Sequence, residues 1–315
     1  MLQLKPCSEV ELETFYNQFG PSARSAYTHA SSPDLYEGPM LEAIANVTFK
    51  EVDTVLRQAT GLHLSSEISH RLLLICPGAS RNTFHAVIPT RYLYEKLRDA
   101  LVNRSLEAGA RLYSMFLRYP KTRTAAAYML DDAIHDLFYK GGEWPVVRLT
   151  PNRPGPKFTH WKTPEAKTNP EYLRIGYQGR PITIAPDQLS NNVKCDALPL
   201  TAFLHGAKLT LVDGYYCPSC ITEETLDAFI YDAASKTATI FQATVWPKYS
   251  IKERGICWLQ GLGVQKFRYV AVTPPDQKMD LPFPNAWNNA RGPSLPDKYV
   301  LIVKDYPILG SASRI

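Results

Sequence analysis

The chain has 315 residues, 45% of them hydrophobic and 21% charged, so it can bury a core of domain size and is not a disordered chain. Lysine and arginine outnumber aspartate and glutamate by 35 to 30, which allows an anionic partner without requiring one. The sequence shows no membrane-spanning run and no secretory signal, and its six cysteines are too few for a disulfide scaffold. We therefore expect an intracellular location, with the nucleus as one candidate compartment, and no membrane partner.

The first 65 residues are predicted to be helical. Ser8 to Glu11 match a capping box, and Gly20 and Pro21 end the helix that follows. A second helix is predicted from about Pro39, because hydrophobic residues then recur every three to four positions. We assign residues 1–65 to a small helical region and residues 66–315 to a second domain.

The second domain is predicted to mix helices and strands. Apolar runs and their turn residues place strands and helices in alternation, with a long basic loop at 151–170, where prolines disfavour both. The expected helices are 90–101, with 111–119 as its continuation, then 124–139 and 251–262; the expected strands are 71–76, 144–149, 181–184, 209–212, 226–231, 237–245, 267–272 and 299–303. This order predicts an α/β fold with a mixed sheet and helices on its faces.

The most informative window is a predicted hairpin of Leu226–Tyr231 and Thr237–Val245. Asp227 opens the first strand, and alternation places Gln242 and Thr244 on one face of the second. A carboxylate followed by two polar groups on a neighbouring strand is the layout of a restriction-endonuclease-like metal site, which holds a hard divalent cation through oxygen ligands. The other interpretation is an ordinary hairpin with polar residues facing solvent.

From about His70 onward, the sequence resembles the C-terminal region of fungal Crinkler-type proteins, which is itself similar to the nuclease-like part of retrotransposon-hot-spot proteins. The matching segments occur in the expected order. They are SHRLLLICPG, IPTRYLYEKL, AAAYMLDDAIHDLFYKGGEWPVVRL, YYCPSCITEETLDAFI, IFQATVWPKYSIKERGICWLQGLG, KFRYVAVTPP and KYVLIV. The resemblance implies a restriction-endonuclease-like mixed sheet flanked by helices.

The resemblance also implies a set of site residues. Asp227 and Gln242 are the metal-site positions, and Asp131 is the acidic residue of the helix that precedes the sheet. With the Ala243 carbonyl as a further neutral ligand, the expected cofactor is Mg²⁺ or Mn²⁺. Thr244 stands where such sites carry a lysine, and a hydroxyl cannot supply a positive charge. Lys248 and Lys252, four and eight residues further on, are the candidate replacements, while His135, one turn after Asp131, is interpreted as structural.

The N-terminal helices resemble the end of the ATPase that often precedes this domain, with Arg24 near the position of an arginine that faces the nucleotide. No phosphate-binding GxxxxGK[ST] loop occurs in the sequence, so we expect no nucleotide cofactor.

Basic residues cluster in two parts of the second domain, with aromatic residues such as Phe158, Trp161 and Trp246 interleaved among them. Lysine and arginine contact phosphates and aromatic rings stack on bases, so these clusters predict a nucleic-acid surface, although a solvated charged face explains them equally well. The candidate contacts are Lys157, Lys162, Lys252, Arg254, Lys266 and Arg268.

Two functions are compatible with these patterns. The first is a nuclease-like domain directed at nucleic acid, with DNA as the expected substrate and catalytic candidates Asp227, Gln242, Thr244, Lys248 and Asp131. The second is an inactive module of the same fold that binds DNA or a protein partner, as an effector would. Thr244 favours the second function, whereas Lys248 favours the first.

Overall fold

A computed structural model describes residues 7–57, 74–77, 84–102, 106–119, 122–155, 157–165, 171–176, 182–186, 195–204, 206–219, 226–249, 251, 253–274, 277–288 and 297–303. The chain forms two compact units, Met1–Met129 and Leu130–Ile315, with the division inside one helix. The expected domain boundary between residues 65 and 66 lies outside the described residues.

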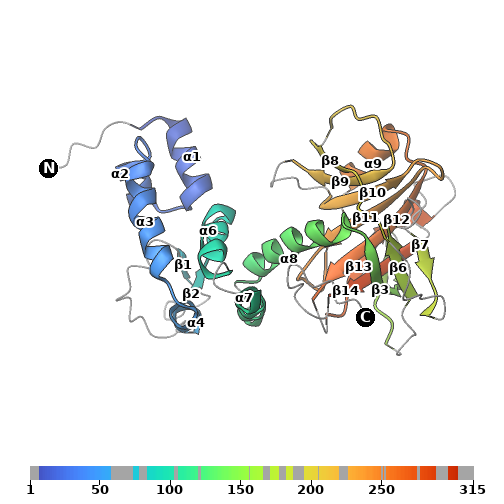
Figure 1. Ribbon diagram of the computed structural model, residues 1–315, viewed down its shortest axis with the longest axis horizontal. Coiled ribbons are helices and arrows are strands. Elements are labelled where there is room, and N and C mark those ends of the chain that lie inside the picture. Colours follow the sequence, from blue (N-terminus) through green and yellow to red (C-terminus); the bar gives the residue numbers. More distant parts are fainter. Residues whose placement is uncertain are drawn as a thin grey trace. The chain divides into compact units, whose positions relative to one another are not determined.

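The N-terminal unit is mainly helical and includes one small hairpin, β1–β2 (Figure 1). Its elements are α1 (Glu9–Phe19), α2 (Ala23–His29), α3 (Asp34–Asn46), α4 (Phe49–Arg57), β1 (Leu74–Pro77), β2 (Phe84–Val87), α6 (Arg91–Val102), α7 (Leu106–Arg118) and the first part of α8 (Arg123–Phe138). The predicted capping box is confirmed: the Ser8 hydroxyl accepts the Glu11 N–H, and the Glu11 carboxylate accepts the Ser8 N–H. Among the described helices, none is long and apolar enough to cross a membrane.

Aromatic packing holds α1, α3 and α6 together. The rings of Phe15 and Phe19 contact the ring of Tyr36, and Phe19 also meets Tyr92 edge to face. The Thr90 hydroxyl caps α6 by accepting the Leu93 N–H. The predicted helix start at residue 90 agrees with this cap, but the predicted continuation of the helix through 111–119 is wrong, because residues 111–118 belong to the separate helix α7.

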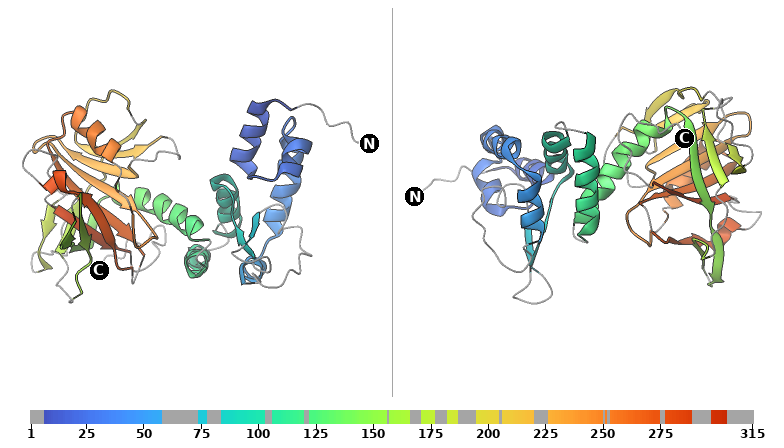
Figure 2. Two further views of the ribbon diagram at one scale, coloured as in Figure 1. Left: turned by 180° about the vertical axis from the view of Figure 1, so that it is seen from behind. Right: turned by 60° about the horizontal axis from the view of Figure 1, so that its bottom comes forward.

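The second unit is built on a curled mixed sheet (Figure 2). The sheet runs in the order β7-β6-β3-β14-β12-β11-β10-β9-β8, and a smaller sheet has the order β13-β5-β4. The elements are β3 (Gly142–Arg148), β4 (Thr150–Pro154), β5 (Phe158–Lys162), β6 (Glu171–Ile175), β7 (Ile182–Ile184), β8 (Leu200–Phe203), β9 (Gly214–Pro218), β10 (Ala228–Asp232), β11 (Thr237–Ala243), α9 (Glu253–Gly261), β12 (Lys266–Thr273), β13 (Asp280–Pro284), the short helix η3 (Asn285–Asn288) and β14 (Asp297–Ile302). The predicted α/β class is confirmed.

Helices cover both faces of the large sheet at its centre. On one face, the ring of Phe138 from α8 lies 4.4 Å from the ring of Phe241 on β11. On the other face, Ile256 and Leu259 of α9 belong to the cluster that contains Ile240. Strands β9, β10 and β11 form an antiparallel meander, and β12 returns parallel to β11 after α9. We call the two sides the α8 face and the α9 face.

The basic stretch 151–170 is not one long loop, which corrects the sequence-based expectation. It contains the hairpin β4–β5, which pairs with β13 in the smaller sheet. Pro151 and Pro154 do not prevent this, because they lie on β4, an edge strand of the smaller sheet. The other edge strand, β13, also carries two prolines, Pro282 and Pro284. The central strand β5 contains no proline.

The strand predicted at residues 209–212 is also wrong. This segment is irregular, and the strands nearby are β8 and β9. Leu209 and Leu211 pack against the core, so their alternation reflects a buried loop segment. Residues 214–218 form the strand β9 because they pair with β10, and a local sequence pattern does not show such pairing between segments.

A buried lysine lies between the two sheets. Lys298 on β14 is 3% exposed, and its Nζ lies 3.9 Å from the centre of the Trp161 ring and 5.2 Å from that of Phe283. Burial lowers the pKa of Lys298 from 10.5 to about 8, because removal from water disfavours the charged form. The two rings offset part of this cost by cation–π attraction.

We expect Lys298→Met to stabilise the protein by about 1–3 kcal/mol at pH 7. The pKa of Lys298 is lower in the folded state than in the unfolded state, so the folded wild type becomes more stable as the pH rises from about 8 to 10.5. Over the same range, the difference in stability between Lys298→Met and wild type therefore becomes smaller. Thermal unfolding at pH 7 and pH 10 measures both effects. The exposed Lys266→Met is the control, expected to change stability by less than about 0.5 kcal/mol. A loss of stability at pH 7 in Lys298→Met would contradict the prediction.

Candidate functional site

The end of the β10–β11 hairpin brings Asp227 next to β11. Its carboxylate accepts the Ala243 N–H at 2.6 Å. Ala228 pairs with Phe241 in the antiparallel register, so one further step places Asp227 opposite Gln242. The hairpin predicted from sequence is thus present, and Asp227 is fixed at its open end.

Gln242 points to the α9 face of the sheet. It is in register with Ala271 on β12, and Ala271 belongs to the cluster on that face. Its neighbour Phe241 points the other way, toward α8. The Gln242 side chain is 6% exposed, so it is largely enclosed by this packing.

Asp131 lies on the opposite side, in a polar cluster on the α8 face. The Nε2 atom of His135 is 3.5 Å from the Asp131 carboxylate, and its Nδ1 atom is 2.8 Å from the Tyr215 hydroxyl. Burial raises the pKa of Tyr215 well above 10, with smaller contributions from Cys217, Asp131 and Asp227, so this tyrosine is neutral. These partners favour the tautomer in which Nε2 donates to Asp131 and Nδ1 accepts from Tyr215.

No local pattern predicts the contact between His135 and Tyr215, because the two residues come from separate elements, α8 and β9. Tyr215 occurs in a segment of neighbouring tyrosines, of which Tyr216 packs in the core on the other face. Strand alternation could have separated the two tyrosines, but only if β9 had been recognised.

Asp227 acts electrostatically on both faces. Its negative charge contributes to raising the pKa of Tyr215 on the α8 face and of Tyr269 on the α9 face, although burial is the larger cause for each. The Tyr269 hydroxyl is buried and has no hydrogen-bond partner among the described residues. Asp227 therefore sits at the rim of the sheet, near both sides.

The proposed ligands of a divalent cation do not form one shell. Asp131 lies on the α8 face and Gln242 points to the α9 face, so the sheet separates them. Among the described residues, no group of three or more His, Cys, Asp or Glu side chains is placed to share an ion. Of the four proposed ligands, Asp131 and Asp227 both contribute to raising the pKa of Tyr215, so these two carboxylates share one neighbour. Two carboxylates are too few for a hard cation, which normally takes six or more oxygen ligands. The set of four predicted from the resemblance does not fit a single Mg²⁺ or Mn²⁺.

Thr244 has a structural contact. It is 2% exposed, its N–H donates to the Val272 carbonyl, and its hydroxyl accepts the Trp246 N–H at 3.1 Å. Lys248, by contrast, is exposed, and its backbone forms a bridge with Asp280 on β13. The chain that leaves β11 is therefore directed toward the smaller sheet.

A basic and aromatic surface, which we call the β5 face, forms on the smaller sheet. Alternation along β5 turns Phe158, His160 and Lys162 outward, each about 45% exposed, while Trp161 turns inward over Lys298. Asp280 lies at one end of this row, with its carboxylate 2.7 Å from His160 Nδ1 and 3.9 Å from Lys162 Nζ.

The segment after β11 extends the β5 face. The Asp280 N–H donates to the Pro247 carbonyl and Lys248 bridges with Asp280, which places exposed Trp246 and Lys248 along the outer side of β13, the neighbour of β5. Lys157, also exposed, precedes Phe158 at the other end of the row. The structure thus joins residues from the two basic clusters, which are far apart in the sequence.

The other predicted phosphate contacts do not join this surface as one group. Lys266 is exposed at the start of β12 but lies in register with Thr237, about 16 Å along the strand from Gln242. The Arg268 guanidinium contacts the Thr239 hydroxyl at 3.3 Å. Arg254 is exposed in the first turn of α9, and Lys252 lies outside the described residues.

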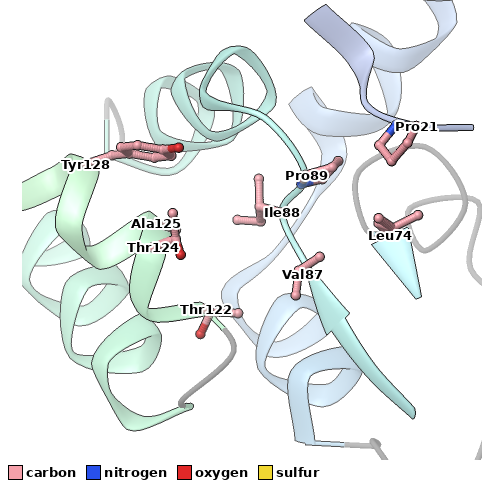
Figure 3. A pocket seen from close by; sticks show the side chains of 9 residues that line it. All are labelled: Pro21, Leu74, Val87, Ile88, Pro89, Thr122, Thr124, Ala125 and Tyr128. Atoms are coloured by element: carbon pink, nitrogen blue, oxygen red, sulfur yellow. The ribbon is translucent and has the colours of Figure 1, made fainter. Parts of the chain in front are cut away.

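The N-terminal unit contains a separate cleft of about 300 Å³ between the start of α8 and the β2–α6 connection (Figure 3). Its lining is mostly apolar, with hydroxyls from two threonines and a tyrosine, and has no charged side chain: Pro21, Leu74, Val87, Ile88, Pro89, Thr122, Thr124, Ala125 and Tyr128. Such a lining offers no acid, base or metal ligand, so the cleft is not a catalytic candidate.

Comparison with known proteins adds no identification: no family model, no curated protein and no solved structure matches this chain.

The burial of Thr244 predicts how substitutions there behave. We expect Thr244→Val to cost about 1–2 kcal/mol of unfolding free energy, because the Trp246 N–H loses its acceptor. Thr244→Lys should cost more, about 3 kcal/mol or above, because it places an ammonium group at a buried position. Chemical denaturation measures both values, with Thr244→Ser as the conservative control. A Thr244→Lys protein as stable as wild type would contradict the buried geometry.

Proposed function

We propose that this chain binds nucleic acid, with DNA as the expected form, through the β5 face. The observation that carries the proposal is the arrangement of exposed cations and aromatic rings around Asp280: its carboxylate contacts Lys162 and His160 of β5, and its backbone pairs with the Trp246–Lys248 segment. Lysine side chains supply phosphate contacts, and exposed rings such as Phe158 and Trp246 can stack on bases.

The geometry favours bases that are accessible. Phe158 is 45% exposed and Trp246 is 41% exposed, so part of each ring is accessible to a base. Stacking on such rings requires unpaired or splayed bases, since bases inside a duplex are already stacked. Single-stranded or frayed DNA is therefore the expected form of the ligand. The resemblance to the nuclease-like region of Crinkler-type proteins points to the same class of ligand.

Binding to single-stranded DNA should weaken steeply with salt, and Lys248→Met should reduce the slope of log K against log salt by about 0.7. The reason is that one phosphate contact, with its released counterion, is lost. Fluorescence anisotropy with a labelled oligonucleotide at several salt concentrations measures the slope. Lys266→Met is the matched control and should leave the slope unchanged. It removes an exposed lysine at the start of β12, next to Thr237 at the end of β11 that is far from Lys248. A slope near zero for wild type would contradict the proposal.

The aromatic part of the surface has its own test. Trp246→Ala should weaken binding by about 1–3 kcal/mol at any salt concentration, because a stacking ring is lost while the charge is unchanged. Tyr27→Ala is the control, since Tyr27 is 53% exposed but lies in the N-terminal unit. Equal affinities for Trp246→Ala and wild type would exclude Trp246 as a stacking residue.

Cation-dependent cleavage is a second candidate function, supported by the two carboxylates near Tyr215. Asp227→Asn should abolish any cleavage that wild type shows with Mg²⁺ or Mn²⁺, and should leave DNA affinity unchanged. Asparagine keeps an oxygen for the Ala243 N–H, so the hairpin end is retained. Asp213→Asn is the control: Asp213 also accepts one backbone N–H at 2.6 Å, from Ala233 at the other end of β10. DNA binding without cleavage by wild type would establish the inactive binding module.

A further inference from the structure

The outer edge of β8 is an exposed strand edge without charge. β8 is the terminal strand of the large sheet, and among the described strands only β9 pairs with it (Figure 1). The surrounding sequence Ala197–Leu204 contains no charged residue. Natural edge strands are usually protected by charges, proline or a covering element, because their free N–H and C=O groups invite pairing with another strand. Pro199 lies one residue before β8, but its carbonyl points to β9, so this proline does not remove an outward N–H group of β8.

The hydrogen bonds show which backbone groups are available. The carbonyls of Pro199 and Phe203 accept the N–H groups of Tyr215 and Ser219 from the β9 side. Backbone groups alternate in direction along a strand, so those of Leu200 and Ala202, together with the Leu204 N–H, point to the outer edge. The outer edge therefore presents a row of backbone N–H and C=O groups, centred on Ala202, that can form hydrogen bonds with another strand.

The side chains make this edge self-complementary. Phe203 packs in the core on the α9 face, so Leu200, Ala202 and Leu204 point to the α8 face. Leu200 is 56% exposed and Leu204 is 58% exposed. In an antiparallel pair with Ala202 opposite Ala202, Leu200 of each copy meets Leu204 of the other. A two-fold interface needs this reciprocity, in which the same patch serves both subunits.

We propose that β8 pairs antiparallel with β8 of a second copy of this chain, with Ala202 on the two-fold axis, which joins the two large sheets into one. The pairing would provide partners for the outward backbone groups and cover both exposed leucines. An unrelated apolar strand could use the same edge, but it would not need the symmetric spacing of the two leucines about Ala202. The proposal is independent of the β5 face and of any nuclease activity.

Sedimentation equilibrium of the full chain tests the proposal. At about 100 µM, the wild-type mass should approach twice the chain mass of 35.4 kDa. Ala202→Lys should weaken dimerisation at least tenfold, because it places two lysines directly opposite each other, with Cα atoms about 5.5 Å apart across the axis, and like charges there repel. Ala202→Glu should do the same. Leu35→Lys, at an apolar residue that is 70% exposed in the N-terminal unit, should behave as wild type.

Mixing the two charge variants gives the decisive result. Equimolar Ala202→Lys and Ala202→Glu should form a mixed dimer, since residue 202 of one copy faces residue 202 of the other. Circular dichroism melting establishes that both variants are folded, and Leu204→Lys replaces either variant that is not, with loss of the dimer as the expected result. A wild-type chain that stays monomeric, a variant that stays dimeric, or folded variants that fail to associate on mixing would each overturn the proposal.

Discussion

Burial of β11 on both faces is the constraint on which the second unit depends. Phe241 packs on Phe138 of α8, and Ile240 packs in the cluster that includes α9. Because successive residues of a strand point to opposite sides, this packing fixes the direction of every other side chain on β11. Gln242 must point to the α9 face, and a shift by one residue would place Phe241 and Ile240 on the wrong sides. The position of Gln242 relative to Asp131 is therefore a consequence of core packing.

The smaller sheet is positioned by a second, less favourable contact. Lys298 projects from β14 between Trp161 of β5 and Phe283 of β13, with its pKa lowered to about 8. Trp161 turns inward to cover this amine, so its neighbours on β5 turn outward. The contact between Trp161 and buried Lys298 thus determines that Phe158, His160 and Lys162 lie on the surface. A buried charge is a poor source of stability, but here its rings determine which residues of β5 reach solvent.

Local signals in the sequence were sufficient for much of the fold. The capping box of α1, the Thr90 cap of α6, the helix α8 and the hairpin β10–β11 all depend on residues close together in the chain. The edge strand β4 and the meander strand β9 depend on partners from distant segments, which composition does not reveal. The arrangement of the candidate site could not be predicted in full for the same reason: alternation relates Asp227 to Gln242, but only packing against α8 shows that Asp131 and Gln242 lie on opposite sides of the sheet.

Thr244 is relevant to both candidate functions, nucleic-acid binding and cleavage. A restriction-endonuclease-like metal site carries a lysine at this position, whereas here the buried hydroxyl accepts the Trp246 N–H and shapes the turn that follows β11. The next contact, from the Asp280 N–H to the Pro247 carbonyl, carries the chain to the edge of the smaller sheet, where Trp246 and Lys248 are exposed along β13. A lysine at residue 244 would lack the acceptor that holds this turn. The residue that departs from the catalytic pattern is therefore the one that holds the turn toward the smaller sheet, and this structural role of Thr244 is consistent with the proposal of a binding surface there.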